Sequence, residues 1–359
     1  MTVLNVLALT RYGRKGASSR MRFEQFVPAL ADLGVDVEIA PLLRDEYIER
    51  LYSKKSKAVG QIFGDYLRRL PWLLQARRFD LLWIEKELFP DLPSWFESLL
   101  GIAGVGYAVD YDDAIFHNYD LSTNPWRRML GRKIDSVMRN ASLVVCGNNY
   151  LANRAVSAGA RRVEVVPTVI DLMRYSVRPS ACTDKLVVGW IGSAATVKYL
   201  DVAVPALRAL SEEYPVQLRV IGADFSAPGI NVECRPWSEY DEVLQIKEFD
   251  IGIMPLLDSP WERGKCGYKL IQYMACGVPV IASPVGVNEL IVEDGASGYL
   301  AGDQKAWLDA FKRLASEPEK RKVFGARGRQ VVEERYCLQV IAPRVAKLFK
   351  EVNTSVRVG

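Results

Sequence analysis

The sequence predicts an α/β fold built from two doubly wound, Rossmann-like domains that face each other across a cleft. Strand-like apolar segments alternate with helix-like segments from residue 3 onward, and the alternation restarts at residue 186. Each run opens with a strand, a loop and a helix. The 359 residues suit two domains of about 150 residues each. We expect a first domain at residues 1–175, a second at 176–338, and a helix at 339–359 that returns to the first domain.

Short, mainly apolar segments predict strands of a parallel sheet that is buried on both faces. In the first domain these segments are residues 3–9, 35–40, 81–84, 106–109, 143–146 and 163–166. Helical spacing of apolar residues predicts the intervening helices at 21–33, within 47–78, and at 93–100, 126–139 and 149–158. A polar, proline-bearing segment after residue 171 is typical of a linker.

The same pattern continues after the linker. The expected strands of the second domain are residues 186–191, 216–221, 232–234, 251–254 and 278–282. The expected helices are 200–213, 240–246, one ending near 276, 307–316, 319–336 and 340–352. Because ligand groups collect at the carboxyl ends of parallel strands, the loops after these strands are the candidate sites.

Composition excludes several classes of protein. A net charge of +4 is too small to indicate nucleic-acid binding. The six cysteines form no CxxC pair and the chain has one histidine, which argues against a zinc site and favours a reducing compartment such as the cytoplasm. No apolar run approaches about 20 residues, so we expect no membrane span. The N-terminal apolar run lacks a preceding basic segment and predicts a first strand instead of a signal peptide.

The segment at residues 264–298, GKCGYKLIQYMACGVPVIASPVGVNELIVEDGASG, carries the clearest functional pattern. It joins a cationic turn to a helix and then a strand, which is typical of an anion site at a helix N-terminus. Lys265 and Lys269 are four residues apart, so they share a face if the helix includes both. Gly267 permits close approach of a ligand to the backbone. An ordinary αβ unit with solvated lysines is the alternative.

Several longer motifs resemble one family. The run YMACGVPVIASPVGVNELIVEDGASGYL is similar to the signature of the family 4 (group 1) retaining glycosyltransferases of GT-B fold, and VVPTVIDLMRY, GWIGSAATVKYL and FDIGIMPL resemble further family segments. The resemblance covers residues 163–299 well and the first domain in outline. It implies retaining transfer of a sugar from a nucleotide-diphosphate sugar to a saccharide or lipid-linked saccharide acceptor. It implies no metal and no cofactor beyond the nucleotide-sugar co-substrate.

The resemblance also assigns donor-side residues. Lys198 and Lys269 are expected to stabilise the negative charge that develops on the leaving diphosphate. The other donor-binding candidates are Gly13, Gly16, Ser193, Lys265, Tyr268, Gln272, Val287, Asn288 and Glu289. Three positions depart from the family pattern. Ser193 replaces an arginine, while Gly264 and Gln272 replace two glutamates that usually contact sugar and ribose hydroxyls; Glu262 and Asp258 are the nearest carboxylates that could substitute.

Catalytic and acceptor-side candidates lie in the first domain. Asp112 stands in the acidic segment after a predicted strand, and His117 lies just downstream, where the family often has a histidine. Expected acceptor-side residues are Ser19, Arg20, Arg22 and Glu85. The alternative is a polar strand end or helix cap and a structural histidine.

A basic, aromatic region at residues 50–78, with Tyr52, Phe63, Tyr66 and Trp72, is compatible with two arrangements: peripheral contact with the anionic inner face of a membrane, or a solvated face of the first domain's helices. The same patch is expected to continue into Trp126, Arg127, Arg128, Arg132 and Lys133.

Two rival functions remain open. One is a non-catalytic, nucleotide-sugar-binding protein that kept the GT-B fold. The other is a Rossmann oxidoreductase, which is disfavoured because neither first loop carries GxGxxG.

Overall fold

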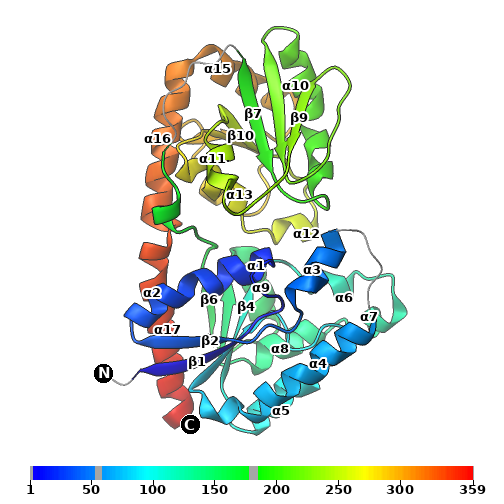
Figure 1. Cartoon of the computed structure of the whole chain (residues 1–359), viewed down its shortest axis with the longest axis vertical. Helices are drawn as coiled ribbons and strands as arrows, with labels where there is room; N and C mark the ends of the chain where they lie inside the picture. Colours follow the sequence, from blue (N-terminus) through cyan, green and yellow to red (C-terminus); the bar gives the residue numbers. More distant parts are fainter. Residues whose placement is uncertain (1–2, 53–58, 178–184, 359) are drawn as a thin grey trace. The chain divides into compact units, whose positions relative to one another are not determined.

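A computed structural model describes residues 3–52, 59–177 and 185–358, and divides the chain into two compact units. The first unit comprises Met1–Val169, Gly264–Cys266 and Leu338–Gly359. The second comprises Ile170–Arg263 and Gly267–Cys337. Each unit contains one six-stranded sheet in which every neighbouring pair of strands is parallel (Figure 1). The predicted α/β class with two Rossmann-like domains is confirmed.

The sheet of the first unit has the strand order β2-β1-β3-β4-β5-β6. Its strands are β1 (Leu4–Leu9), β2 (Val35–Ile39), β3 (Leu81–Glu85), β4 (Tyr107–Tyr111), β5 (Leu143–Cys146) and β6 (Val163–Val165). The order steps outward in both directions from β1 and β3. Their carboxyl ends therefore lie at the point where the direction of winding reverses, which is the usual ligand position in such sheets.

Helices cover both faces of this sheet. One face packs against α2 (Val27–Asp32) and α17 (Leu338–Val358), with Trp83 of β3 in ring contact with Phe23 and Phe349. The other face packs against α4 (Val59–Leu74), α5 (Trp95–Ile102), α8 (Lys133–Asn140) and α9 (Asn149–Ser157). The remaining short elements are α1 (Ala17–Arg22), η1 (Glu24–Phe26), α3 (Asp45–Tyr52), η2 (Ala76–Arg78), α6 (His117–Asp120) and α7 (Pro125–Met129).

The second unit has the strand order β12-β11-β10-β7-β8-β9. Its strands are β7 (Leu186–Ile191), β8 (Val216–Ile221), β9 (Asn231–Arg235), β10 (Ile251–Met254), β11 (Val280–Ala282) and β12 (Gly298–Leu300). The winding reverses between β7 and β10, so the carboxyl ends of these two strands mark the expected ligand position of this sheet.

Helices again form two layers. One face of the second sheet packs against α10 (Val204–Ser211) and α15 (Gln304–Ser316). The other packs against α11 (Glu242–Ile246), α13 (Tyr268–Ala275) and α16 (Pro318–Arg335). Short elements complete the unit: η3 (Leu172–Arg174), η4 (Val197–Val202), α12 (Pro260–Arg263) and α14 (Asn288–Ile291).

Three predicted helices are broken in the structure, and one of them, expected at 200–213, is divided into η4 and α10. The helix expected at 21–33 is divided into α1, η1 and α2, because Pro28 lacks the N–H of a helix interior and lies in the first turn of α2. The helix expected at 126–139 is divided into α7 and α8, with Gly131 between them. These breaks shorten the helices without changing the order of strands.

Candidate active site

In the second unit, Lys269 of α13 lies beside the loop that follows β7. A Cβ atom at Gly192 would lie 3.0 Å from the Lys269 Cε atom and 2.5 Å from the Trp190 ring. The Lys269 ammonium also stands 5.5 Å from the centre of that ring, within the range of a cation–π contact. The Trp190 ring therefore leaves no room for a Cβ atom at residue 192, and the Lys269 side chain packs against the same glycine at the carboxyl end of β7. This geometry brings one predicted donor residue to the predicted edge of the sheet.

The helix that carries Lys269 begins at Tyr268. Gly267 is the N-cap of α13 and adopts a left-handed conformation with φ of 66°, so Lys265 precedes the helix. The condition under which Lys265 and Lys269 would share a helix face is therefore not met. The physical reason is the backbone turn at Gly267, which a sequence spacing of four residues does not reveal.

The turn that contains Val287, Asn288 and Glu289 packs against the start of α13. A Cβ atom at Gly267 would lie 2.3 Å from Ile291 Cδ1 and 3.1 Å from Val287 Cγ1. Val287 and Asn288 are buried, and the Asn288 Nδ2 atom donates to the Ser283 carbonyl at 3.0 Å. Glu289 is exposed. The structure thus brings Val287 and Asn288 to the N-terminus of α13, where the helix dipole favours an anion.

Gln272 occupies a buried position. Its side-chain Nε2 donates to the Tyr175 hydroxyl at 2.9 Å, and the Tyr175 hydroxyl donates to Glu242 Oε1 at 3.2 Å. Tyr268, another predicted donor residue, places its hydroxyl 3.4 Å from that of Tyr175. With 2% of its surface exposed, Gln272 contributes to packing beneath the site, which does not favour the expected contact with a ribose.

Lys198 and Ser193 flank the loop after β7. Lys198 lies in η4 and is exposed, with its ammonium 5.4 Å from the centre of the Tyr199 ring. The Ser193 carbonyl accepts hydrogen bonds from the Thr196 and Val197 amides, which closes the turn that leads into η4. The structure therefore places Lys198 at the far end of the loop that Lys269 approaches.

The two carboxylates considered as substitutes for the family glutamate already have protein partners. Glu262 is buried and accepts hydrogen bonds from the hydroxyls of Tyr199 and Ser259. Asp258 forms a two-point ion pair with Arg263, with N–O distances of 2.6 and 2.9 Å. Their side chains serve the local structure of α12 and the loop before it.

Residues Gly264–Cys266 belong by their contacts to the first unit. A Cβ atom at Gly264 would lie 2.5 Å from the Cβ atom of Ala114, and the Lys265 carbonyl accepts a hydrogen bond from Asn148 Nδ2 at 2.9 Å. In this arrangement a side chain larger than the hydrogen atom of glycine does not fit at residue 264. This close contact accounts for the glycine at the position where the family pattern has a glutamate.

In the first unit, charged side chains gather at the carboxyl ends of β3 and β4. Arg22 of α1 binds both carboxylate oxygens of Asp110, at 2.8 and 3.0 Å. Lys86 forms an ion pair with Asp112 at 2.8 Å. Glu85 accepts a hydrogen bond from the Ser19 hydroxyl at 2.6 Å. Four predicted residues, Ser19, Arg22, Glu85 and Asp112, thus lie at one edge of the sheet.

The pKa values of the two neighbouring carboxyls, Asp112 and Glu85, shift in opposite directions. Burial acts to raise the pKa of Asp112, but the nearby Lys86 charge and hydrogen bonds lower that pKa below its ordinary value. Burial raises the pKa of Glu85 despite the Lys86 charge and the Ser19 hydrogen bond. One oxygen of Glu85 has no hydrogen-bond partner within the described part of the chain. The two neighbouring acids therefore have distinct environments.

Sequence reasoning missed the partners that hold this edge together. Lys86 has a φ of 65°, unusual for a residue other than glycine, and this turn directs the chain between Glu85 and Glu87. Glu87 is buried and binds Lys133 at 2.6 Å. Asp110 is the partner of Arg22. Alternating charges at the end of a strand, Glu85-Lys86-Glu87, were the available signal, but sequence alone does not identify which charges pair.

The other predicted residues of the first unit lie in the loop after β1 or its helix. Gly13 lies beside Asp45 and Gly16 beside Tyr12, so close that a Cβ atom would contact either side chain. Arg20 is buried, and its Nη1 atom donates to the Arg14 carbonyl at 3.2 Å. These contacts shape the loop itself.

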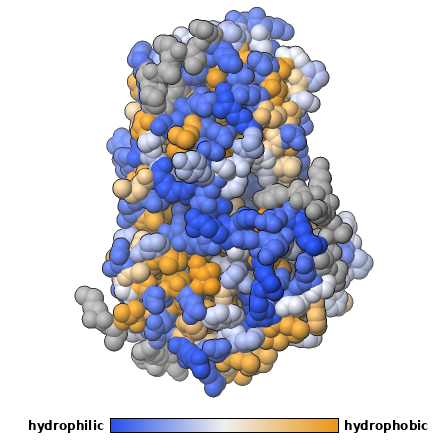
Figure 2. Space-filling model, in the orientation of Figure 1, coloured by the Kyte–Doolittle hydropathy of each residue, from blue (hydrophilic) through white to orange (hydrophobic). Residues whose placement is uncertain are grey.

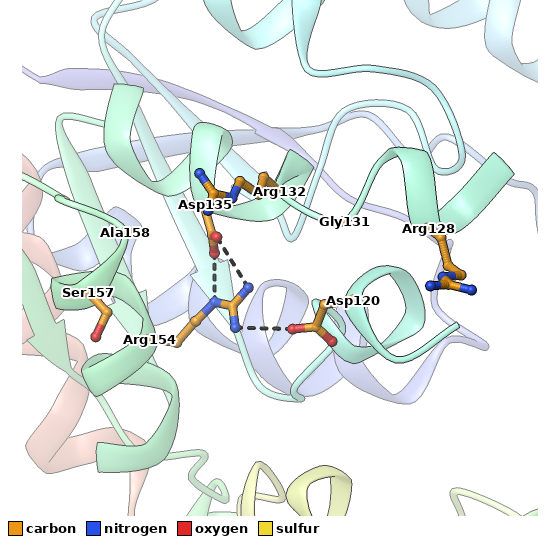
Figure 3. Close-up of a pocket in the computed structure, with 8 residues that line it drawn as sticks. All are labelled: Asp120, Arg128, Gly131, Arg132, Asp135, Arg154, Ser157 and Ala158. Atoms are coloured by element: carbon orange, nitrogen blue, oxygen red, sulfur yellow. Dashed lines mark hydrogen bonds and ion pairs between the residues drawn. The ribbon is translucent and has the colours of Figure 1, made fainter. Parts of the chain in front are cut away.

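His117 belongs to a separate chain of polar contacts. Its Nδ1 lies 2.8 Å from Asp120 Oδ1 and its Nε2 lies 2.9 Å from the Tyr150 hydroxyl, so both ring nitrogens are engaged. Figure 3 shows Arg154 between the carboxylates of Asp120 and Asp135. These side chains line a hollow of about 580 Å³ on the first unit, together with Arg128, Gly131, Arg132, Ser157 and Ala158. The contacts favour a structural role for His117.

The described residues offer neither a metal-binding cluster nor a membrane-spanning helix. Across residues 3–52, 59–177 and 185–358, no group of three or more His, Cys, Asp or Glu side chains is placed to hold a metal ion. None of the helices within those ranges is long and apolar enough to cross a membrane.

Comparison with known proteins adds independent information. Residues 185–317 match the family model described as glycosyl transferases group 1. The chain is 24% identical over 263 residues to a D-inositol 3-phosphate glycosyltransferase of Saccharomonospora viridis, which covers 65% of this chain and 60% of that protein. It is 34% identical over 91 residues to a phosphatidyl-myo-inositol mannosyltransferase of Mycobacterium leprae, covering 25% and 24%. The matches thus span less than two thirds of these relatives.

Solved structures share the fold. A sucrose-phosphate synthase from Thermosynechococcus elongatus superposes with a TM-score of 0.74 at 15% identity, covering 98% of this chain and all of that one. Anabaena HepE, solved in complex with UDP-glucose, superposes with a TM-score of 0.69 at 16% identity, covering 97% of this chain and all of that one. The resemblance drawn from the sequence motifs is confirmed for residues 185–317, which match the group 1 glycosyl transferase model.

Proposed function

We propose that this protein transfers a sugar from a nucleotide-diphosphate sugar to a saccharide or lipid-linked saccharide acceptor, with retention of configuration. The position of Lys269 is the observation that carries the proposal. Its side chain reaches the loop after β7, beside Gly192, in the part of the chain that matches the group 1 family model. A cation at the carboxyl end of a parallel strand, on the first turn of a helix, is suited to bind a diphosphate.

The chemistry follows from charge. Breaking the bond between the sugar and the diphosphate leaves negative charge on the leaving phosphate, and preorganised cations stabilise that charge in the transition state. Lys269 and Lys198 would supply the positive charges, and the N-terminus of α13 would add its dipole. Val287, Asn288 and Glu289 are suited to line the same site because their turn packs against Gly267. No metal or further cofactor is part of this proposal.

Named relatives support the choice of substrates. One match is called an N-acetyl-alpha-D-glucosaminyl L-malate synthase, and several are called D-inositol 3-phosphate glycosyltransferases. HepE was solved with UDP-glucose. We therefore propose a nucleotide-sugar donor and a hydroxyl-bearing acceptor held by the first unit near Ser19, Arg22 and Glu85. The five described cysteines are free thiols, in keeping with a proposed cytoplasmic location.

The first experiment identifies the donor. Thermal unfolding of the protein is measured with UDP-, GDP-, ADP- and dTDP-sugars in turn. A ligand at 100 times its dissociation constant adds about 2.7 kcal/mol to the free energy of unfolding. The nucleotide that stabilises the protein is then incubated with it, and release of the nucleoside diphosphate is followed with and without candidate acceptors.

The Lys269→Ala variant tests the site itself. Loss of one preorganised charge is expected to lower kcat/KM by about 100- to 1,000-fold. Lys305→Ala, at an exposed lysine of the same unit, is the control and should retain wild-type kinetics. Wild-type turnover and donor affinity in Lys269→Ala would refute the proposed role of this lysine.

A second candidate is a nucleotide-sugar-binding protein without transferase activity. The observation in its favour is Gly264, where close packing against Ala114 leaves no room for the glutamate of the family pattern. The two candidates differ in one measurement: a binding protein saturates with the nucleotide sugar but releases no nucleoside diphosphate. Release with an acceptor present would exclude the second candidate.

A further inference from the structure

The first unit exposes two rows of large apolar side chains on neighbouring helices. On α4 the row consists of Phe63, Leu67 and Leu74, which are 66%, 50% and 86% exposed. On α5 it consists of Trp95, Leu99 and Ile102, which are 71%, 57% and 84% exposed. Successive members of the α4 row are four and seven residues apart, and those of the α5 row are four and three residues apart. These spacings place each row along one face of its helix. Each helix therefore has a core-facing side and an apolar outer side.

The two helices are joined through shared contacts on their inner sides. The Phe89 ring packs in a tilted arrangement against Tyr66 of α4, with ring centres 5.3 Å apart, and against Phe96 of α5, with ring centres 4.6 Å apart. At their C-terminal ends, Arg77 donates to the Ala103 carbonyl at 3.2 Å. Figure 2 shows hydrophobic residues gathered at the lower edge of the face in view, where Figure 1 draws α4 and α5. The two rows thus form one outer surface, here called the α4–α5 face.

Charge is distributed unevenly across this face. The acidic residues of α4 and α5, Asp65 and Glu97, are both buried. Arg68, Arg77 and Arg78 are exposed, and Arg68 is paired with Asp65 at 3.3 Å. Arg77 donates to the Ala103 carbonyl, and Arg78 donates to the side-chain amide oxygen of Gln75. Neither of these acceptors is a carboxylate, so neither hydrogen bond neutralises the guanidinium charge. The solvent side of α4, η2 and α5 is therefore apolar and cationic.

We infer that the α4–α5 face binds the surface of an anionic lipid bilayer. Apolar side chains in rows, with tryptophan and phenylalanine among them and arginines at the edge, match the interfacial zone, where acyl chains lie next to phosphates. Guanidinium groups bind lipid phosphates and gain from the negative surface potential. A bilayer satisfies both kinds of side chain at once. This inference does not depend on the proposed transferase activity.

The structure also changes the composition of the patch predicted from the sequence. Tyr66 and Trp72 pack against the core of the first unit, and Lys133 is buried. The Tyr52 side chain lies outside the described residues. Phe63 alone of the four aromatic residues named for region 50–78 lies in the exposed rows. Trp95, Leu99 and Ile102 of α5 were not in the predicted patch.

Co-sedimentation of the full chain with vesicles tests the inference. One set of vesicles contains phosphatidylcholine alone and the other contains phosphatidylcholine with phosphatidylglycerol. We expect binding to the anionic vesicles, weakened by salt. The double variant Leu74→Ser/Ile102→Ser is expected to bind about tenfold more weakly, since two large side chains no longer enter the interface. The matched control, Leu244→Ser/Val323→Ser, removes two exposed apolar side chains of the second unit and should bind like the wild type.

A second variant, Arg77→Glu/Arg78→Glu, is expected to abolish the preference for anionic vesicles, and it carries the test if the first variant fails to fold. Circular dichroism checks the fold of every variant. Three results would overturn the inference: no binding of the wild type to anionic vesicles, equal binding of wild type and Leu74→Ser/Ile102→Ser, or a concentration-dependent dimer that this variant dissociates. The last result would assign the face to a second copy of the chain.

Discussion

The two sheets place very different chemistry at their carboxyl ends. In the first unit the strand ends carry buried ion pairs, Arg22 with Asp110 and Lys86 with Asp112. In the second unit the corresponding edge has Gly192 and Gly267, with Lys198 and Lys269 close by. The first edge neutralises its own charges. The second edge has glycines in place of larger side chains, and it has lysines near a helix N-terminus.

This difference indicates a division of labour within the chain. Buried ion pairs fix the position of side chains because breaking one leaves an uncompensated charge. A rigid, internally paired edge is suited to present hydroxyl and carboxyl groups to a neutral acceptor. Glycines and unburied lysines are suited to receive a ligand that brings its own negative charge. The following changes are designed to test the contrast, beginning with the largest expected effect.

Asp112→Asn should damage the first edge most. It removes the charge that pairs with the buried Lys86, and breaking one partner of such a pair costs about 3–5 kcal/mol in the free energy of unfolding. Urea unfolding of wild type and variant measures the difference. Asp258→Asn breaks the exposed pair with Arg263 and is the control, with little change expected. A variant as stable as the wild type would show that the pair does not hold the edge.

The stability difference between wild type and Asp112→Asn is expected to depend on pH. Because the folded pKa of Asp112 is below its ordinary value of 3.8, the pair contributes stability above that value. The contribution is lost as the pH falls through the depressed pKa. The stability difference between wild type and Asp112→Asn should therefore be constant near neutral pH and shrink in acid. A difference that grows on acidification would contradict the assignment.

Gly267→Ala tests the second edge. The left-handed φ of 66° and the contact of 2.3 Å with Ile291 together are expected to cost about 3 kcal/mol. Gly295→Ala is the matched control, since residue 295 has a φ of 74° but open space around it, and should cost about 1 kcal/mol. Thermal unfolding compares the two. Equal losses would mean that the turn at 287–291 does not press on the start of α13.

Ser19→Ala gives the smallest expected loss. It removes the 2.6 Å hydrogen bond to Glu85, and a hydrogen bond to a charged group contributes about 2 kcal/mol. Ser157→Ala, at an exposed serine, should leave stability unchanged. If Ser19→Ala costs as little as the control, then Glu85 is held by its other partners.

The sequence predicted the sheets better than the helices or the site. Strands β5, β7, β8 and β10 have their predicted bounds, because short segments rich in Val, Ile and Leu are typical of central parallel strands. The helix bounds depended on Pro28 and Gly131, whose effects are local and easily underestimated. Lys269 was identified because its motif is contiguous. The pairing of Lys86 with Asp112 joins the ends of two strands, and only the folded register determines it.

The course of the chain through α17 has a consequence for biosynthesis. Phe349 of this helix contacts Trp83 in the middle of the first sheet, together with Ile341, Val345 and Val352 in the same apolar cluster. Those residues leave the ribosome only after the whole second unit has been made. The nascent first unit therefore waits with one face of its sheet only partly covered, by α2, while the second unit is complete by Cys337. During translation, the part of the molecule that begins first finishes its core last.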